Sequence, residues 1–173
     1  LELGGKNPNI IMSDADLDIA IPGVIDGMGY TRQGQACKAG SRVYNHEKIY
    51  DKVVNRAVEK LSKLKMGNAL DEKFDIGAII SEEQLKRTLY YMDIAKKNSS
   101  TKILHGGNQS KGGEYRDGFY YEPTMLSGLP VSSPVCQEEV FGPVACAIPF
   151  KSFDEVMESA NDTQFGLSAV LWT

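Results

Sequence analysis

The sequence predicts an α/β fold with a largely parallel β-sheet. Stretches in which apolar residues recur at helical spacing alternate along the chain with short apolar runs of strand length. Such alternation is typical of strand–helix–strand units, whose consecutive strands run parallel. A length of 173 residues suits one domain with a sizeable core, and no internal repeat or flexible linker divides it.

The first part of the chain predicts two strands separated by a helix. Residues 9–12 form a short apolar run suited to a strand, and capping residues at 13–16 precede a helical apolar pattern at residues 17–28. Pro22 lies inside this pattern, and we expect a kink or a later helix start there because proline lacks a backbone N–H. Residues 41–44 predict the second strand.

The middle of the chain predicts two helices followed by a strand. Residues 47–65 carry apolar side chains on one face and Lys and Glu on the other, which is typical of a long packing helix. After a loop to Ile80, Ser81 and Gln84 form a capping-box pattern that predicts the start of the next helix. Residues 101–105 then predict a strand.

The last part of the chain opens with a glycine-rich stretch at residues 106–113. We expect a surface turn there, because a phosphate-binding loop would need an amphipathic helix directly after it. Residues 120–126 are predicted to be extended, and residues 144–150 have the apolar pattern of a buried strand. A capping box at Ser152 predicts a further helix, and residues 166–172 predict a final strand.

Composition narrows the classes of function. Hydrophobic residues make up 42% of the chain and charged residues 24%, as in ordinary globular domains. A net charge of −4 without a long basic run argues against a nucleic-acid partner or an anionic membrane, and no apolar run is long enough to span a bilayer. Three cysteines without metal-ligand spacing predict no metal site and suit a reducing, cytoplasmic location.

Two residues stand out as candidates for catalysis. Cys37 lies in a turn bracketed by Gly34 and Gly40 and next to Lys38, the setting of a thiolate nucleophile. The alternative interpretation is a small buried hydrophobic residue. Glu2, close to a Gly-Gly pair, is a candidate general base, and folding would have to bring it near Cys37 from 35 positions away.

Three motifs in order resemble those of one family. Residues 2–6 (Glu-Leu-Gly-Gly-Lys) with residues 34–37 (Gly-Gln-Ala-Cys) resemble the paired signature of the NAD(P)-dependent aldehyde dehydrogenases, and residues 138–144 resemble the family's cofactor-contacting stretch. The resemblance runs along essentially the whole chain. It implies a three-layer catalytic domain, with residues 1–6 ending the cofactor-binding domain or its linker and residues 7–173 forming a catalytic domain that is incomplete at its C-terminus.

The resemblance also implies roles for individual residues. Cys37 would attack an aldehyde, and the resulting thiohemiacetal would become a thioester as hydride passes to NAD or NADP. Glu2 would be the base that activates water to hydrolyse the thioester, and the Cys37 N–H would contribute to an oxyanion hole. Glu139 would bind the nicotinamide ribose, Phe141 would pack near the nicotinamide, and Leu3 would also contact the cofactor.

Two alternatives stay open at this point. One is a CoA-acylating member of the family, against which Glu2 argues because such members tend to lack a hydrolytic base. The other is a catalytically silent relative with a structural or binding role, against which the presence of both Cys37 and Glu2 argues.

The resemblance predicts a small-molecule aldehyde as substrate and a homo-oligomer as the assembled protein. Because the chain starts at Leu1 without an initiator Met and stops at Thr173 in a strand-like run, we expect a fragment of a longer protein. Arg32 and Lys38 are among the residues that depart from the family pattern. Arg32 stands where relatives often have Asn, and Lys38 stands where small or apolar residues are usual, so both bear on substrate preference.

Overall fold

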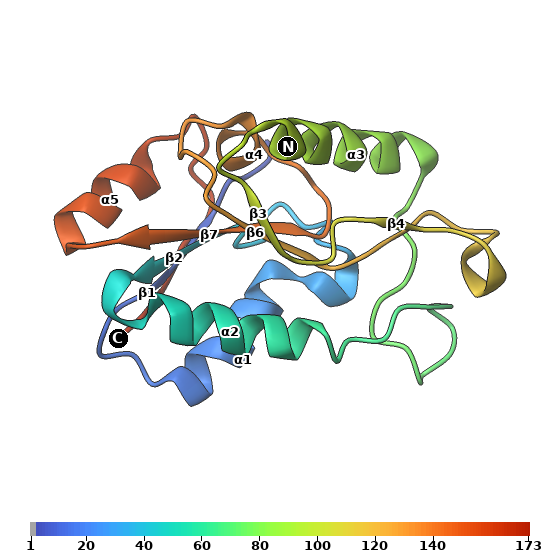
Figure 1. Cartoon of the computed structure of the whole chain (residues 1–173), viewed down its shortest axis with the longest axis horizontal. Coiled ribbons are helices and arrows are strands. Elements are labelled where there is room, and N and C mark those ends of the chain that lie inside the picture. Colours follow the sequence, from blue (N-terminus) through green and yellow to red (C-terminus); the bar gives the residue numbers. More distant parts are fainter. Residues whose placement is uncertain (1–2) are drawn as a thin grey trace.

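The computed structural model describes residues 3–173, which contain a six-stranded sheet covered by helices on both faces (Figure 1). The strand order is β3-β6-β7-β2-β1-β8; β3 runs antiparallel to β6 and every other neighbouring pair is parallel. The predicted α/β class with a largely parallel sheet is therefore confirmed. The strands are β1 (Pro8–Ile11), β2 (Arg42–His46), β3 (Lys102–His105), β6 (Thr124–Ser127), β7 (Val144–Phe150) and β8 (Val170–Trp172).

One face of the sheet is covered by α1 (Leu17–Met28) and α2 (Tyr50–Leu61). Their apolar sides and the facing strand residues form one buried core cluster. α1 starts at Leu17 and passes through Pro22, so the predicted helix has no later start at the proline.

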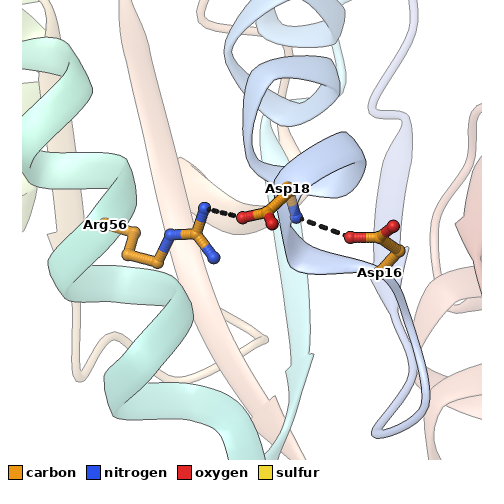
Figure 2. A network of polar contacts seen from close by, with 3 residues as sticks. All are labelled: Asp16, Asp18 and Arg56. Atoms are coloured by element: carbon orange, nitrogen blue, oxygen red, sulfur yellow. Dashed lines mark hydrogen bonds and ion pairs between the residues drawn. The ribbon is translucent and has the colours of Figure 1, made fainter.

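A small polar network connects the start of α1 with α2 (Figure 2). The carboxylate of Asp16 caps α1 by accepting the Asp18 N–H at 2.9 Å, and Arg56 of α2 pairs with the Asp18 carboxylate at 2.6 Å. The Asp18 side chain is 85% exposed, so the ion pair itself contributes under about 1 kcal/mol. The cap satisfies a backbone donor that the first turn would otherwise leave unpaired.

The other face carries α3 (Glu82–Lys97), α4 (Pro134–Gln137) and α5 (Phe153–Asn161), which pack on a second core cluster. Ser81 caps α3 and Ser152 caps α5, each accepting a backbone N–H three residues later at 3.2 Å. Because helices pack on both faces of the sheet, the sheet is the middle one of three layers, as the resemblance implies. None of the helices within residues 3–173 is long and apolar enough to cross a lipid bilayer.

Two predicted elements differ in length from those of the structure. The helix predicted at residues 47–65 is a 3₁₀ turn (Glu47–Ile49) followed by α2, which ends at Leu61. Beyond Leu61 the backbone hydrogen bonds change: the Leu64 N–H donates to the Leu61 carbonyl at 3.1 Å, and the N–H groups of Asp75 and Ile76 donate to the Lys65 carbonyl at 2.7 and 3.0 Å. The last strand is also shorter than predicted, since only Val170–Trp172 pairs with β1.

The glycine-rich stretch is more than a surface turn. Within it, β4 (Gln109–Ser110) pairs antiparallel with β5 (Tyr120–Tyr121), forming a two-stranded ribbon beside the main sheet. Two further 3₁₀ turns complete the structure, Tyr30–Arg32 before the cysteine turn and Gly113–Tyr115 in the ribbon. Sequence periodicity misses the ribbon because two-residue strands are too short to show alternation.

Candidate active site

The turn that carries Cys37 is fixed by positive-φ backbone. Gln33 and Gly34 adopt φ values of 56° and 63°, and the Gly34 N–H donates to the Gly29 carbonyl at 2.9 Å. A Cβ at Gly34 would lie 2.2 Å from the Gly142 carbonyl oxygen, so only glycine fits there. The turn is thereby pressed against the loop that contains the Glu-Val-Phe-Gly motif.

Cys37 is the exposed cysteine of the chain, whereas Cys136 and Cys146 are buried. A hydrogen bond with Cys136 and burial both raise the pKa of the Cys146 thiol. A thiol held protonated in the core has little nucleophilic character. A hydrogen bond from Cys146 lowers the pKa of the Cys136 thiol, but that thiol is buried, so of the three sulfurs that of Cys37 is the one exposed to a ligand.

The buried side-chain amide of Asn7 holds the Cys37 turn in place. Its Nδ2 donates to the carbonyls of Cys37 at 2.7 Å and Ala39 at 3.1 Å, and its Oδ1 accepts the Ser168 N–H at 3.0 Å. Gly5 allows this close approach, because a Cβ there would lie 2.2 Å from the Cys37 carbonyl oxygen. One amide thus joins three segments that are far apart in sequence.

Glu139 meets the same N-terminal segment. Its Oε1 accepts the Gly5 N–H at 2.9 Å, a contact between residues 134 positions apart. Gly4, at φ 74°, lies so near that a Cβ there would be 3.0 Å from Glu139 Oε2. The hydrogen bond from Gly5 orients one carboxylate oxygen and leaves the other able to accept from a ligand.

Helix α3 fixes the loop after Glu139. Gln84 Nε2 donates to the carbonyls of Val140 at 3.0 Å and Phe141 at 2.7 Å, and the Arg87 guanidinium donates to the Glu139 carbonyl at 2.6 and 3.3 Å. Phe141 has a φ of 54°, a left-handed conformation that costs a non-glycine residue about 1–2 kcal/mol. The hydrogen bonds from α3 stabilise this strained backbone, which sets the direction of the phenyl ring.

These residues enclose a cavity of about 470 Å³, which we call the Cys37 cavity. Four of the five predicted site residues, Leu3, Cys37, Glu139 and Phe141, line it. The fifth, Glu2, lies outside the described residues. The other lining residues are Gly4, Gln84, Arg87 and Leu167.

Sequence reasoning misses Asn7, Gln84 and Arg87 as parts of the site. The sequence predicts that Gln84 completes a capping box, but its backbone N–H alone takes part in the cap, and its side chain reaches the 140–141 loop instead. The signal for Asn7 is a polar residue at the entry to a buried strand, where an unpaired amide would be costly. Arg87 gives no signal, because an exposed helix face is the ordinary place for arginine.

Two buried cations line a further cavity of about 540 Å³, together with residues of α5. Lys6 is 2% exposed, and burial lowers its pKa. Arg42 is fully buried and donates to the carbonyls of Lys6 at 2.6 and 3.0 Å and Ala160 at 2.8 Å. Within residues 3–173, no group of three or more His, Cys, Asp or Glu side chains is arranged to hold a metal ion.

Comparison with known proteins identifies the family. The model of the aldehyde dehydrogenase family matches residues 1–173, the whole chain. The chain belongs to the aldehyde dehydrogenase family. Sequence comparison shows 40% identity to the D-glyceraldehyde dehydrogenase (NADP(+)) of Picrophilus torridus and 38% to the betaine aldehyde dehydrogenase of Mesorhizobium japonicum, over 100% of this chain in each case.

Solved structures agree with this membership. The NAD+ complex of an aldehyde dehydrogenase from Bacillus cereus superposes with a TM-score of 0.93 at 39% identity, covering 100% of this chain and 34% of that one. The chain likewise spans 34% of the Picrophilus relative and 35% of the Mesorhizobium relative. This aldehyde dehydrogenase chain thus corresponds to about a third of the length of its relatives.

Proposed function

We propose that the protein containing this chain oxidises an aldehyde to a carboxylic acid with NAD or NADP, through a covalent intermediate on Cys37. The observation that carries the proposal is the Cys37 cavity, which the exposed Cys37 lines together with Glu139 and Phe141. Family membership supports the reaction class, and relatives and neighbours named for NADP or solved with NAD+ support the choice of cofactor.

The residues around the Cys37 cavity fit a nicotinamide ribose. The Glu139 carboxylate is oriented by the Gly5 N–H through one oxygen, so its other oxygen is free for a ribose hydroxyl. Phe141 and Leu3 offer apolar surface on the same side of Cys37. When bound, NAD or NADP would accept the hydride that leaves the aldehyde carbon.

Cys37 supplies the nucleophile. Its thiolate would add to the carbonyl carbon, and the oxygen would take the negative charge of a tetrahedral thiohemiacetal. Within residues 3–173 the Cys37 N–H donates to no backbone or side-chain acceptor, so it is free to stabilise that oxyanion. Loss of hydride from this adduct would leave a thioester on Cys37.

Hydrolysis would complete the cycle. We assign Glu2 as the base that removes a proton from the attacking water, so that the thioester yields a carboxylic acid and free Cys37. Support comes from its chain neighbours, because Leu3 and Gly4 both line the Cys37 cavity. The assignment of residues 1–6 to the cofactor-binding side and residues 7–173 to the catalytic domain remains part of the proposal, as do a cytoplasmic location and a homo-oligomer.

The test compares the full-length protein with Cys37→Ala and Glu2→Gln variants in NADH or NADPH formation from a panel of aldehydes. We expect Cys37→Ala to lower turnover by at least about a thousandfold. Glu2→Gln should give one equivalent of reduced cofactor per site and then accumulate acyl-enzyme, seen by mass spectrometry. Cys136→Ala, which removes a buried thiol, is the matched control and should keep turnover.

Three outcomes would contradict the proposal. Undiminished turnover by Cys37→Ala would show that Cys37 is not the nucleophile. Formation of acyl-CoA when CoA is supplied, with no free acid, would favour a CoA-acylating enzyme. If no reduced cofactor forms with any aldehyde of the panel, a catalytically silent protein would be favoured.

A further inference from the structure

A second cavity of about 520 Å³ lies beside the Cys37 turn. Thr31, Arg32, Lys38 and Gly40 of the turn line it, together with Ser168 and Val170 near β8. We call it the Lys38 cavity. It is distinct from the Cys37 cavity and shares no lining residue with it.

The Lys38 cavity begins one residue after the nucleophile. Cys37 and Leu167 line the Cys37 cavity, and the residues that directly follow them, Lys38 and Ser168, line the Lys38 cavity. Because neighbouring Cα atoms lie about 3.8 Å apart, a group bound by Lys38 is close to Cys37.

Positive charge predominates in the Lys38 cavity. Arg32 and Lys38 are exposed, and neither forms an ion pair with any group in residues 3–173. Asp26, also exposed, is the one acidic side chain among the lining residues and is not bonded to either cation. Two cations against one carboxylate leave an excess positive charge directly next to the nucleophile.

A buried hydrogen-bond donor lies close to two glycines that line the Lys38 cavity. Asn9 is fully buried, and its Nδ2 has no hydrogen-bond acceptor within the described part of the chain. A Cβ at Gly27 or Gly40, both lining the Lys38 cavity, would lie 3.1 or 3.2 Å from that nitrogen. A buried donor without an acceptor is energetically costly, and this one lies close to two glycines of the Lys38 cavity.

We propose that the aldehyde substrate carries a carboxylate or phosphate group, which Arg32 and Lys38 bind in the Lys38 cavity while the carbonyl reaches Cys37. This inference rests on the proposed function and names its substrate class. The guanidinium of Arg32 can bind either anion through two N–H groups, and Lys38 adds a point charge. Charge next to the nucleophile also steers anionic substrates toward the site.

The experiment measures kcat/KM of the full-length protein for matched pairs of aldehydes. 4-Oxobutanoate is compared with butanal, and glyceraldehyde 3-phosphate with glyceraldehyde, so that the two pairs separate carboxylate from phosphate. We expect at least one anion to be preferred by about tenfold or more over its neutral partner. The preference should fall as ionic strength rises, because salt screens exposed charges.

Variants assign the preference to residues. Arg32→Gln and Lys38→Gln should each lower the anionic-to-neutral ratio about fivefold, mainly through KM, because an ion pair made equally in ground and transition states changes binding rather than kcat. Asp26→Asn should raise the ratio. Lys111→Gln, which removes an exposed lysine from the β4–β5 ribbon, should leave it unchanged.

The outcomes separate this inference from the proposed function. Equal oxidation of anionic and neutral aldehydes, or a ratio that neither Arg32→Gln nor Lys38→Gln alters, would overturn the substrate class while leaving aldehyde oxidation intact. Absence of reduced cofactor with every aldehyde would overturn the proposed function and this inference with it.

Discussion

At the scale of single residues, the site depends on glycines that allow backbones to touch. Gly34 combines a left-handed φ of 63° with a position where a Cβ would lie 2.2 Å from the Gly142 carbonyl oxygen. Gly29 shares the conformation, with a φ of 67°, but a Cβ there would meet nothing within 4 Å. A substitution at Gly29 therefore tests backbone strain alone, whereas one at Gly34 tests strain and close packing together.

We predict that Gly34→Ala lowers the free energy of unfolding by more than about 2 kcal/mol, because strain and a backbone clash add together. Gly29→Ala should cost only about 1 kcal/mol, the conformational part alone. Denaturant unfolding of both variants measures the difference. Equal costs at the two positions would contradict the close contact between the Cys37 turn and Gly142.

Residue types also explain how much of the site is predictable from the sequence. Cys37 and Glu139 carry reactive groups within short recognisable motifs, so the sequence alone predicts both as site residues. Asn7 acts through the two carbonyls and the Ser168 N–H that it bonds, and these come from residues 30, 32 and 161 positions away. No local pattern encodes such a contact, because it exists only in the folded chain.

At the scale of elements, α3 serves the site although it contributes no reactive group. Its first turns present Gln84 and Arg87 to the carbonyls of the 139–141 loop. Thr88 packs where a Cβ on Gly142 would lie 2.4 Å from its Oγ1, so helix and loop are in direct contact. The helix thus determines how Glu139 and Phe141 face the Cys37 cavity.

We predict that Gln84→Leu weakens cofactor binding about tenfold, because two carbonyls lose their donors and the strained Phe141 backbone relaxes. Ser81→Ala is the control: it removes the α3 cap at a cost of about 1 kcal/mol without touching the loop. Titration of the full-length protein with NADH or NADPH by calorimetry gives the dissociation constants. A Gln84→Leu effect no larger than that of Ser81→Ala would contradict the positioning role.

The elements themselves are largely predictable. Helical and strand periodicities locate the strands of the main sheet and helices α1, α2, α3 and α5, because each buries a continuous apolar face. The ends of the elements are less predictable. α2 ends at Leu61 rather than at the predicted Lys65, and the Lys65 carbonyl accepts from residues 75 and 76 instead, a contact that helical periodicity does not encode.

At the scale of the whole molecule, the burial of Lys6 makes the free energy of unfolding depend on pH. Lys6 lines a cavity together with residues of α5, and burial lowers its pKa below the unfolded value of 10.5. Between these two pKa values the unfolded chain binds a proton that the folded chain has released. The free energy of unfolding therefore rises with pH across that window, whereas below both values the cost of burying the charge is constant.

We predict that the stability difference between the parent and Lys6→Met shifts in the parent's favour as pH rises toward 10.5. Urea unfolding at several pH values from neutral to 10.5 gives this difference. Lys60→Met, which removes an exposed lysine on α2, should show a difference that does not vary with pH. A constant difference for Lys6→Met as well would mean that Lys6 titrates alike in the folded and unfolded chain.

The contact between Gly5 and Glu139 also affects how the chain folds. Gly5 contacts Glu139 from 134 positions away, and Asn7 contacts Ser168 from 161 positions away. Contacts this distant in sequence form slowly, since a long loop must close before they stabilise anything. During synthesis, Gly5 cannot bond Glu139 until the 134 positions that separate them have been translated, so the site around Cys37 cannot form before then.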